Sequence, residues 1–335
     1  MIGSTRRTIG GLVMWLFFLG VLLYLPGHIS RGTQEILLSL LIWVGVAQAW
    51  NIIGGIGGQL SLGNSVFVGA GGYAAAMLII KAGLAWSLAL VLAGLISAAI
   101  AYVLSFPLLR LSGVYFTIGS AAVALAALAW MVTWEWTGQS QGLNISLDDV
   151  PDRNLKFQVI ASLAILICIV VFLILRSTFG LRLMAVRDDE SAAGALGVSP
   201  RHVKQRAFVL SAFLTGLMGA AVAFNQVSIE PKSMFSLTWV VTALVMVIVG
   251  GMGTLWGPVI GAFVIYYVVD RALEGQPVLQ ALLSGVLIII VISVAPNGIV
   301  GLIEQAWSWI VRLVRRDKAN PPEPVEPERE VVHHA

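Results

Sequence analysis

The interior of the chain has one long stretch of charged side chains that could take part in chemistry, residues 176–206, named here the polar segment. It contains six basic residues, three consecutive acids at 188–190 and a run of small residues at 192–195, and long apolar stretches flank it on both sides. A chain that only had to reverse at a membrane surface would need a short turn. About thirty residues of helix-forming composition therefore predict a surface that meets a partner.

The sequence lacks the motifs of enzymes that would use such residues. None of the five lysines stands in a GxxxxGK[ST] phosphate-binding loop, so the chain is not expected to hydrolyse ATP. It contains no HExxH motif, no CxxC motif and no nucleophile constellation, and the single cysteine, Cys168, lies in an apolar run. His333 and His334 lack a third metal ligand. We therefore expect no catalytic residue, no metal site and no cofactor in this chain.

The elements that position the polar segment must cross a membrane. Of the 335 residues, 58% are hydrophobic and only 11% are charged, and the mean hydropathy is +0.92. Soluble domains carry about a quarter charged residues, so the composition indicates an integral membrane protein with one membrane domain. The pI near 9.2 suits lysine and arginine facing an anionic lipid leaflet, and it gives no reason to expect nucleic-acid binding.

Apolar runs of membrane-spanning length recur along the chain. They predict an all-α, polytopic fold of about 8–10 transmembrane helices with glycine-rich broken or re-entrant segments. The ten candidate spans cover approximately residues 9–26, 35–53, 62–80, 86–109, 113–134, 158–175, 207–226, 238–255, 257–271 and 279–296. No convincing small-residue cleavage site follows the first run, so we expect a retained helix rather than a signal peptide.

Glycine interrupts the apolar pattern at two places, which are the candidates for a translocation path. The third span is glycine-rich from residue 54 to 73, and only residues 253–258 separate the eighth span from the ninth. Interrupted helices at membrane depth are tolerated where the backbone is buried in protein or lines a wet cavity. The alternative is close helix packing through small residues. The residues that would line a path are Gln59, Ser61, Asn64, Ser65, Gly251 and Gly253.

The distribution of Lys and Arg predicts the orientation of the spans. With ten spans and a cytoplasmic N-terminus, fourteen of the twenty basic residues fall on the cytoplasmic side, including all those of the polar segment. Both termini are then cytoplasmic. Residues 1–311 would form the transmembrane domain, and residues 312–335, which are rich in Pro and Glu, would form a disordered cytoplasmic tail.

Ionisable residues are nearly absent from the middle of the spans, since Glu35 and Asp270 stand at span ends. Ion-coupled transporters usually keep intramembrane carboxylates or histidines for a relay, although carbonyls and hydroxyls can hold sodium. An ion-coupled secondary transporter or a passive channel is therefore the less favoured alternative. A scaffold without a pore has no need of broken spans. If the protein pumps a solute, we expect the energy to arrive from another protein.

Four stretches stand out in order along the chain. They are NIIGGIGGQLSLGNSVFVGAGGYAAAML at 51–78; LRLSGVYFTIGSAAVA at 109–124 with TGQSQGL at 137–143; FGLRLMAVRDDESAAGALGVSPRHVKQRAFVLSAFLTGLMGA at 179–220; and VMVIVGGMGTLWGPVIGAF at 245–263 with PNGIVGL at 296–302. Together they resemble the membrane subunits of branched-chain amino acid ABC importers, of the LivM type. Asn64, where His is more usual in that family, and GQSQG at 138–142 are departures that bear on the ligand.

The resemblance implies an importer assembled from several chains. This chain would pair with a second, homologous but different permease, two cytoplasmic ATPases would bind ATP and Mg, and an extracytoplasmic binding protein would deliver the substrate. Glu190-Ser191-Ala192-Ala193 followed by Gly197 resembles the Glu-Ala-Ala…Gly signature at which permeases meet their ATPases; the alternative is an ordinary solvated loop. The ATPase-coupling residues so implied are Arg187, Asp188, Asp189, Glu190, Ala192, Ala193, Gly197 and Pro200.

Local backbone chemistry agrees with a docking helix in this segment. Gly197 can provide a turn that a residue with a Cβ would strain, and Pro200 can open the next helix at its first turn. The sequence therefore favours a permease subunit, not an enzyme, in a bacterial-type inner membrane. It would form the path for branched-chain or related amino acids in an ATP-driven importer. The alternative cargo within the same family is urea or a short amide.

Overall fold

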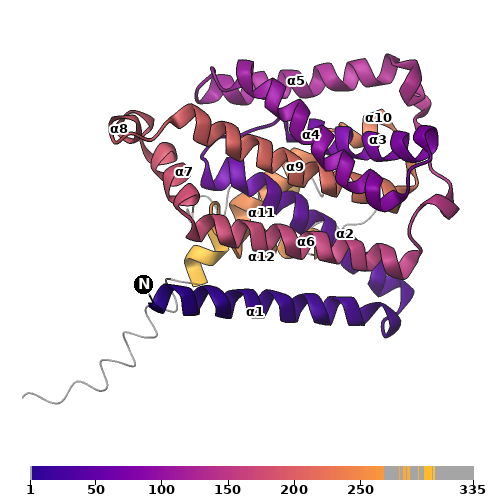
Figure 1. Ribbon diagram of the computed structural model, residues 1–335, viewed down its shortest axis with the longest axis horizontal. Helices are drawn as coiled ribbons and strands as arrows, with labels where there is room; N and C mark the ends of the chain where they lie inside the picture. The colour runs from indigo at the N-terminus through magenta and orange to yellow at the C-terminus, as the bar shows by residue number, and fades with distance from the viewer. Residues whose placement is uncertain are drawn as a thin grey trace, which may run out of the picture.

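The computed structural model describes residues 2–267 and, beyond them, residues 279, 282–283, 285–286, 293, 298–303 and 305. The described chain forms a bundle of helices that run side by side along one axis (Figure 1). Its one small sheet pairs the two-residue strands β1 (Leu143–Asn144) and β2 (Ser228–Ile229) in antiparallel register. The predicted all-α, polytopic membrane architecture is confirmed.

The helices follow one another in the order of the predicted spans, with two additions in the polar segment and one short helix before the eighth span. In chain order they are α1 (Ile2–Tyr24), α2 (Arg31–Asn51), α3 (Asn64–Ala82), α4 (Trp86–Leu108), α5 (Val114–Thr133), α6 (Arg153–Arg176), α7 (Thr178–Asp188), α8 (Glu190–Ala195), α9 (Pro200–Gln226), α10 (Pro231–Met234), α11 (Thr238–Gly250) and α12 (Gly257–Val264).

Seven helical segments of the described chain are long and apolar enough to cross a membrane, and they correspond to the second to eighth predicted spans. Two shorter apolar helices, Val13–Gly27 and Gly257–Tyr267, match the first and ninth. The eighth ends at Gly250 rather than at the predicted 255, because Gly251 takes a φ of +131°, which a helix cannot continue. Most of the tenth predicted span and the tail at 312–335 lie outside the described residues.

Helix α9 occupies the core of the bundle, and α5 lies at its edge (Figure 1). Of the membrane-spanning window of α9, 83% is buried, against 22% for α5. Small residues allow α9 to touch α3 through the backbone: a Cβ on Gly71 would lie 2.1 Å from the Gly216 carbonyl oxygen, and one on Gly219 would lie 2.2 Å from that of Val68. Because lipid provides no hydrophobic drive between helices, such close packing holds the core together.

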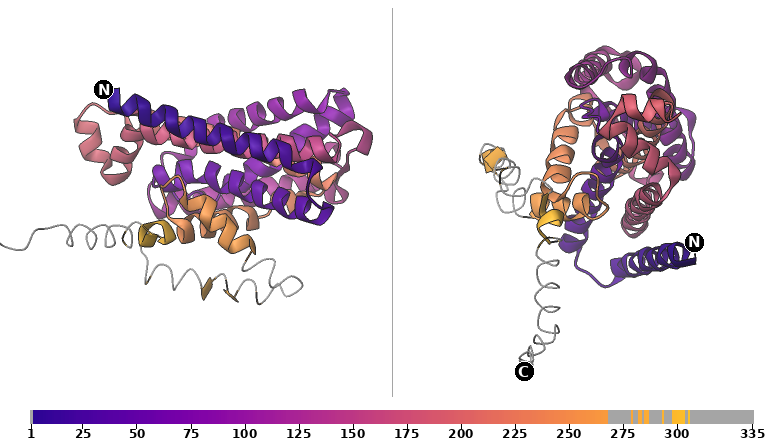
Figure 2. Two further views of the ribbon diagram at one scale, coloured as in Figure 1. Left: turned by 90° about the horizontal axis from the view of Figure 1, so that it is seen from below. Right: turned by 90° about the vertical axis from the view of Figure 1, so that its left-hand side faces the viewer.

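The two ends of the bundle differ in chemistry (Figures 1 and 2). At one end lie the beginning of α1 and, apart from it, α7 and α8, which belong to the polar segment. At the opposite end lie the loop 134–152, the paired strands and α10. The N-terminus and the polar segment therefore share one end, which is the relative arrangement that the charge distribution predicted.

Candidate functional site

The first glycine-rich interruption, residues 52–63, is named here the first break. Helix α2 continues into it as the π-helical turn Ile52–Ile56, and the chain then reverses at Gly58, whose φ is +68°. It returns as a non-helical stretch until α3 begins at Asn64, beside Ser211 of α9. A non-helical segment thus reaches the core of the bundle, but it lies before the predicted third span. That span itself is the continuous helix α3, so the expected interruption within it is wrong: Gly69, Gly71 and Gly72 are helical.

Side chains from two helices, and that of Ser61 in the break itself, bind the backbone of the first break. The Trp50 indole donates a hydrogen bond to the Ser61 carbonyl oxygen (2.8 Å), and the Ser120 hydroxyl accepts one from the Leu62 amide (3.0 Å). The hydroxyl of Ser61 itself accepts from the Gly63 amide at 3.3 Å. Irregular backbone persists at membrane depth only where protein groups satisfy it. Ser61, one of the predicted path residues, is fully buried and supports the backbone in this structure.

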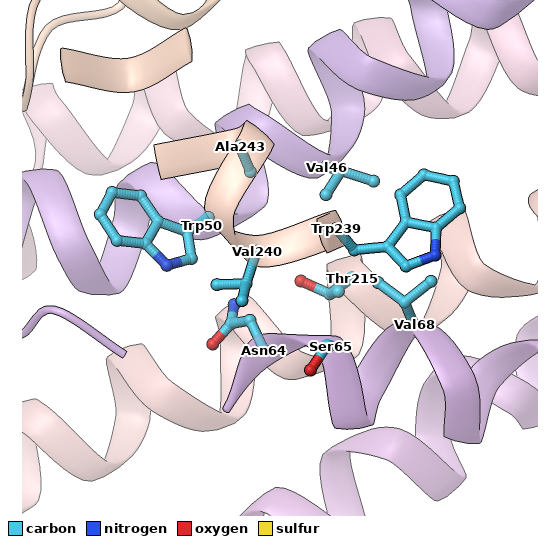
Figure 3. Close-up of a pocket in the computed structure, with 9 residues that line it drawn as sticks. All are labelled: Val46, Trp50, Asn64, Ser65, Val68, Thr215, Trp239, Val240 and Ala243. Atoms are coloured by element: carbon cyan, nitrogen blue, oxygen red, sulfur yellow. The ribbon is translucent and has the colours of Figure 1, made fainter. Parts of the chain in front are cut away.

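Asn64 and Ser65, at the inner end of the first break, face a tightly packed internal pocket between α2, α3, α9 and α11, which leaves no room for a water molecule (Figure 3). The Asn64 amide donates to the Ser211 hydroxyl at 3.1 Å. By contrast, Asn64 Oδ1 and Ser65 Oγ are buried and have no hydrogen-bond partner in the described chain. The pocket walls are formed by Val46, Trp50, Asn64, Ser65, Val68, Thr215, Trp239, Val240 and Ala243.

Unpaired polar atoms in a buried pocket oppose folding. Each such group costs about 1–3 kcal/mol, so a purely structural position would favour an apolar residue. The pocket combines these two polar atoms with the rings of Trp50 and Trp239 and with valine side chains (Figure 3). The lining of this closed pocket is therefore a mixture of polar and apolar groups.

The second interruption, residues 251–256, is named here the second break and separates α11 from α12. Gly251 and Gly253 both have positive φ, +131° and +75°. The Thr254 hydroxyl donates to the Gly251 carbonyl oxygen (2.8 Å) and accepts from the Gly257 amide (2.9 Å), which fixes the start of α12. Gly298, from the PNGIVGL motif, packs against Gly251: a Cβ on Gly298 would lie 2.5 Å from the Gly251 Cα.

Two amide side chains of α2 bind the second break to the end of that helix, beside the first break. Asn51 Oδ1 accepts from the Gly253 amide and Asn51 Nδ2 donates to the Thr254 carbonyl oxygen, both at 2.9 Å. Gln48 Nε2 donates to the carbonyl oxygen of Leu255 at 2.6 Å. A Cβ on Gly55 would lie 2.6 Å from the Gly253 nitrogen, so only glycine permits this approach. The two glycine-rich interruptions, predicted as separate path elements, therefore form one unit.

Neither Gln48 nor Asn51 was among the sequence-predicted site residues, although Asn51 stood in the first motif. A signal was available. The two residues are three apart, so they share one face of a helix, and both are fully buried. Polar side chains within membrane spans are rare and generally need a partner inside the bundle. The sequence did not show that this partner is the backbone of the second break.

The polar segment forms α7, α8 and the beginning of α9. Asp189 caps α8, because its Oδ1 accepts from the amides of Ser191 (2.8 Å) and Ala192 (2.9 Å). Gly197 has a φ of +82° and Pro200 is the first residue of α9, so both adopt the predicted local roles. Ala193 is only 3% exposed. Ala193 therefore packs α8 against the rest of the protein, whereas the opposite side of α8 is exposed to solvent.

Ion pairs organise the charges of this segment. Arg187 pairs with Asp188 at 2.9 Å, and Lys204 pairs with Glu190. An open pocket of about 350 Å³ lies between these residues, the first break and the start of α5. It is lined by Gly57, Gly58, Gln59, Leu60, Ser112, Gly113, Val114, Phe116, Thr117, Val186, Arg187, Asp188, Asp189, Glu190 and Lys204.

The open pocket unites residues predicted for two different roles. Gln59, a predicted path residue, shares it with four predicted coupling residues, Arg187, Asp188, Asp189 and Glu190. The Gln59 side-chain oxygen is buried and unpaired in the described chain. Asn64 and Ser65 lie deeper, at the internal pocket. The predicted coupling residues therefore lie at the end of the bundle, and the predicted path residues begin beside them at Gln59 and continue inward to Asn64 and Ser65.

Comparison with known proteins places the chain in a family. A family model described as "Branched-chain amino acid transport system / permease component" matches residues 32–292. The LivM permease protein of the high-affinity branched-chain amino acid transport system of Escherichia coli is 30% identical over 298 residues, covering 79% of this chain and 69% of that protein. Its counterpart in Salmonella typhimurium is 31% identical over 278 residues, covering 74% and 65%.

A more distant relative is the probable LivH permease protein of Methanocaldococcus jannaschii, 28% identical over 159 residues, or 45% of this chain and 49% of that protein. The chain spans about two thirds of the length of its two LivM relatives. No solved structure matches it. On the family match over residues 32–292, this chain belongs to the permease components of branched-chain amino acid transport systems.

Proposed function

We propose that this transport subunit forms the translocation path of an ATP-driven importer for branched-chain or related amino acids. The observation that carries the proposal is the connection of two broken helices, joined in the core, to a polar segment at the end of the bundle. Membrane proteins keep broken helices where the backbone lines a path. A polar segment beside such a break offers a place where another protein can move it.

The internal pocket supports a path for amphipathic solutes. Asn64 Oδ1 and Ser65 Oγ offer hydrogen bonds to a polar group, while Trp50, Trp239 and Val240 contact an apolar side chain. The pocket is closed in this structure, so passage requires α3 and α11 to separate. Alternating access of this kind needs only weak binding, and specificity would rest with an external binding protein.

The energy source is proposed to be two ATPase subunits, which bind ATP and Mg, because the chain has no phosphate-binding loop. Their docking surface would be α8 with its neighbours, where Leu196 is 85% exposed. Burial of this exposed apolar side chain against a partner would favour binding. A second, homologous permease would complete the pore, and an extracytoplasmic binding protein would dock at the end that carries loop 134–152.

The orientation follows from the same assignment. With the polar segment and the N-terminus in the cytoplasm, the basic residues obey the positive-inside rule. The C-terminus would also be cytoplasmic. Residues 1–311 would form the permease domain in a bacterial inner membrane.

Reconstitution tests the proposal. The tagged chain is purified with whatever subunits accompany it and placed in liposomes with the receptor protein. We expect leucine uptake against a gradient that requires ATP, and no concentrative uptake by the chain alone. Uptake by the chain alone driven by a sodium or proton gradient would refute the ATP-driven mechanism. ATP-driven uptake of urea, with leucine excluded, would refute the amino acid assignment.

A further inference from the structure

Arg187 occupies the place where the polar segment meets the breaks. It lies in the last turn of α7, and its side chain is 35% exposed. Its Nε and Nη2 both approach Asp188 Oδ1 at 2.9 Å. Its third nitrogen, Nη1, points inward and donates a long hydrogen bond (3.5 Å) to the carbonyl oxygen of Gly55 in the first break.

The glycines of both breaks surround this side chain. A Cβ on Gly58 would lie 2.3 Å from Arg187 Cγ, so the arginine stem occupies the space of the missing side chain. A Cβ on Gly253, in the second break, would lie 3.4 Å from Arg187 Nη1 and 3.1 Å from the Gly55 carbonyl oxygen. Gly58 and Gly253 also have positive φ, which disfavours any larger residue. The two breaks therefore form a cradle for one guanidinium.

The cradle is continuous with the contact between the breaks. Arg187 reaches the Gly55 carbonyl oxygen, Gly55 packs on the Gly253 amide, and Asn51 holds that amide and the Thr254 carbonyl oxygen. A displacement of α7 must therefore move the arginine within the cradle or move both breaks with it. Coupling between distant sites is carried by contiguous packed and hydrogen-bonded groups of this kind.

We propose that Arg187 is a positioning residue through which movement of the polar segment is transmitted to both breaks at once. The inference rests on the proposed function, because it concerns how ATPase action reaches the path. The guanidinium suits the role because it presents several donors in a fixed plane, so one side chain binds Asp188 and Gly55 in different directions. Lysine, with a single nitrogen, cannot keep both contacts.

The test uses the complete complex in proteoliposomes with three variants. Arg187→Met keeps most of the stem and removes the guanidinium, and Arg187→Lys keeps the charge. The matched control is Arg182→Met, an exposed arginine on the same helix. We expect Arg187→Met and Arg187→Lys to hydrolyse ATP at near wild-type rates while leucine uptake per ATP falls about tenfold, within the usual range of coupling energies. Arg182→Met should behave as wild type.

A second readout follows the breaks directly. Single cysteines replace Leu60 in the first break or Met252 in the second, in a Cys168→Ala background; both side chains are about two-fifths exposed, at 41% and 39%. In the single-cysteine proteins that retain Arg187, trapping the ATPases with vanadate should change the rate at which maleimide labels each cysteine. In Arg187→Met both rates should stay constant.

Three results would overturn the inference. One is normal uptake per ATP in Arg187→Met. Another is a vanadate-induced change in labelling of Met252→Cys that persists when Arg187→Met is also present, because movement would then reach the second break without Arg187. The last is dissociation of the ATPases from Arg187→Met but not from Arg182→Met, which would make Arg187 a docking contact. Failure of the wild-type complex to take up leucine with ATP would instead refute the proposed function, so the two failures are distinguishable.

Discussion

The two breaks are built differently although both are rich in glycine. The first break leads to polar side chains, Gln59, Asn64 and Ser65, whose oxygen atoms are buried and unpaired in the described chain. The second break exposes its backbone instead, and Asn51 and Gln48 from α2 bind that backbone at three points. The first break therefore offers groups to a ligand, whereas the second serves as the partner against which the first is held. This difference predicts that substitutions in the two breaks have effects of different kinds.

The largest effect is expected where the breaks touch. In Gly55→Val, the new Cβ would lie 1.9 Å from Asn51 Oδ1 and 2.6 Å from the Gly253 nitrogen, so it would separate the breaks. Overpacking together with lost hydrogen bonds should lower the free energy of unfolding by about 3 kcal/mol or more. Thermal melting of the purified protein in detergent measures it. Gly32→Ala on the same helix, where a Cβ meets nothing within 4 Å, is the control. Equal melting temperatures for the two variants would show that the breaks are not in contact.

The next effect concerns the amides that hold the second break. Asn51→Leu removes two hydrogen bonds and should cost about 2–3 kcal/mol. Gln48→Leu removes one bond but also an unpaired buried oxygen, so we expect about 1 kcal/mol. The same melting assay ranks them. Gln34→Leu, at the other end of α2, loses only two bonds of 3.4 Å and is the control. A Gln48→Leu loss as large as that of Asn51→Leu would contradict the central role of Asn51.

Two substitutions, one at each break, should change the free energy of unfolding in opposite directions. Ser65→Ala, at the inner end of the first break, removes a buried hydroxyl without a partner, so stability should rise by about 1 kcal/mol while leucine uptake falls. Thr254→Val, in the second break, removes the bonds that start α12, so stability should fall by about 1 kcal/mol. Melting and uptake are measured together. A destabilised Ser65→Ala would mean that its hydroxyl serves the fold, and the contrast between the breaks would be lost.

The smallest effect on stability is expected outside both breaks. Leu196 is 85% exposed beside α8, so Leu196→Ser should change the free energy of unfolding by less than about 0.5 kcal/mol. Because this leucine lies on the proposed docking surface, the amount of ATPase that co-purifies with the tagged chain should fall. Unchanged co-purification would remove Leu196 from the docking surface without affecting the comparison of the breaks.

Much of the fold was predictable from local patterns. The spans, the glycine interruptions, the turn at Gly197 and the start of α9 at Pro200 all follow from residue types within one or two helical turns. These patterns did not determine the surroundings of the predicted site residues. Asn64 and Ser65 lie at the internal pocket, whereas Ser61 supports the backbone and Ala193 is buried beneath α8. Whether such a side chain faces a pocket, binds the backbone or is buried depends on which neighbouring helix covers it. Local sequence composition does not contain that information.

The sequence by itself determined that this protein crosses the membrane and that glycine clusters interrupt its apolar pattern near residues 54–58 and 250–257. These properties are local, because a helix in lipid satisfies its own backbone and its apolar length must match the bilayer. Only the tertiary structure decided which polar groups meet. Asn51 binds Gly253 across 202 residues, and Arg187 reaches Gly55 across 132. Such contacts depend on the depth and rotation at which helices pack, and these are decided by small-residue contacts across the whole core.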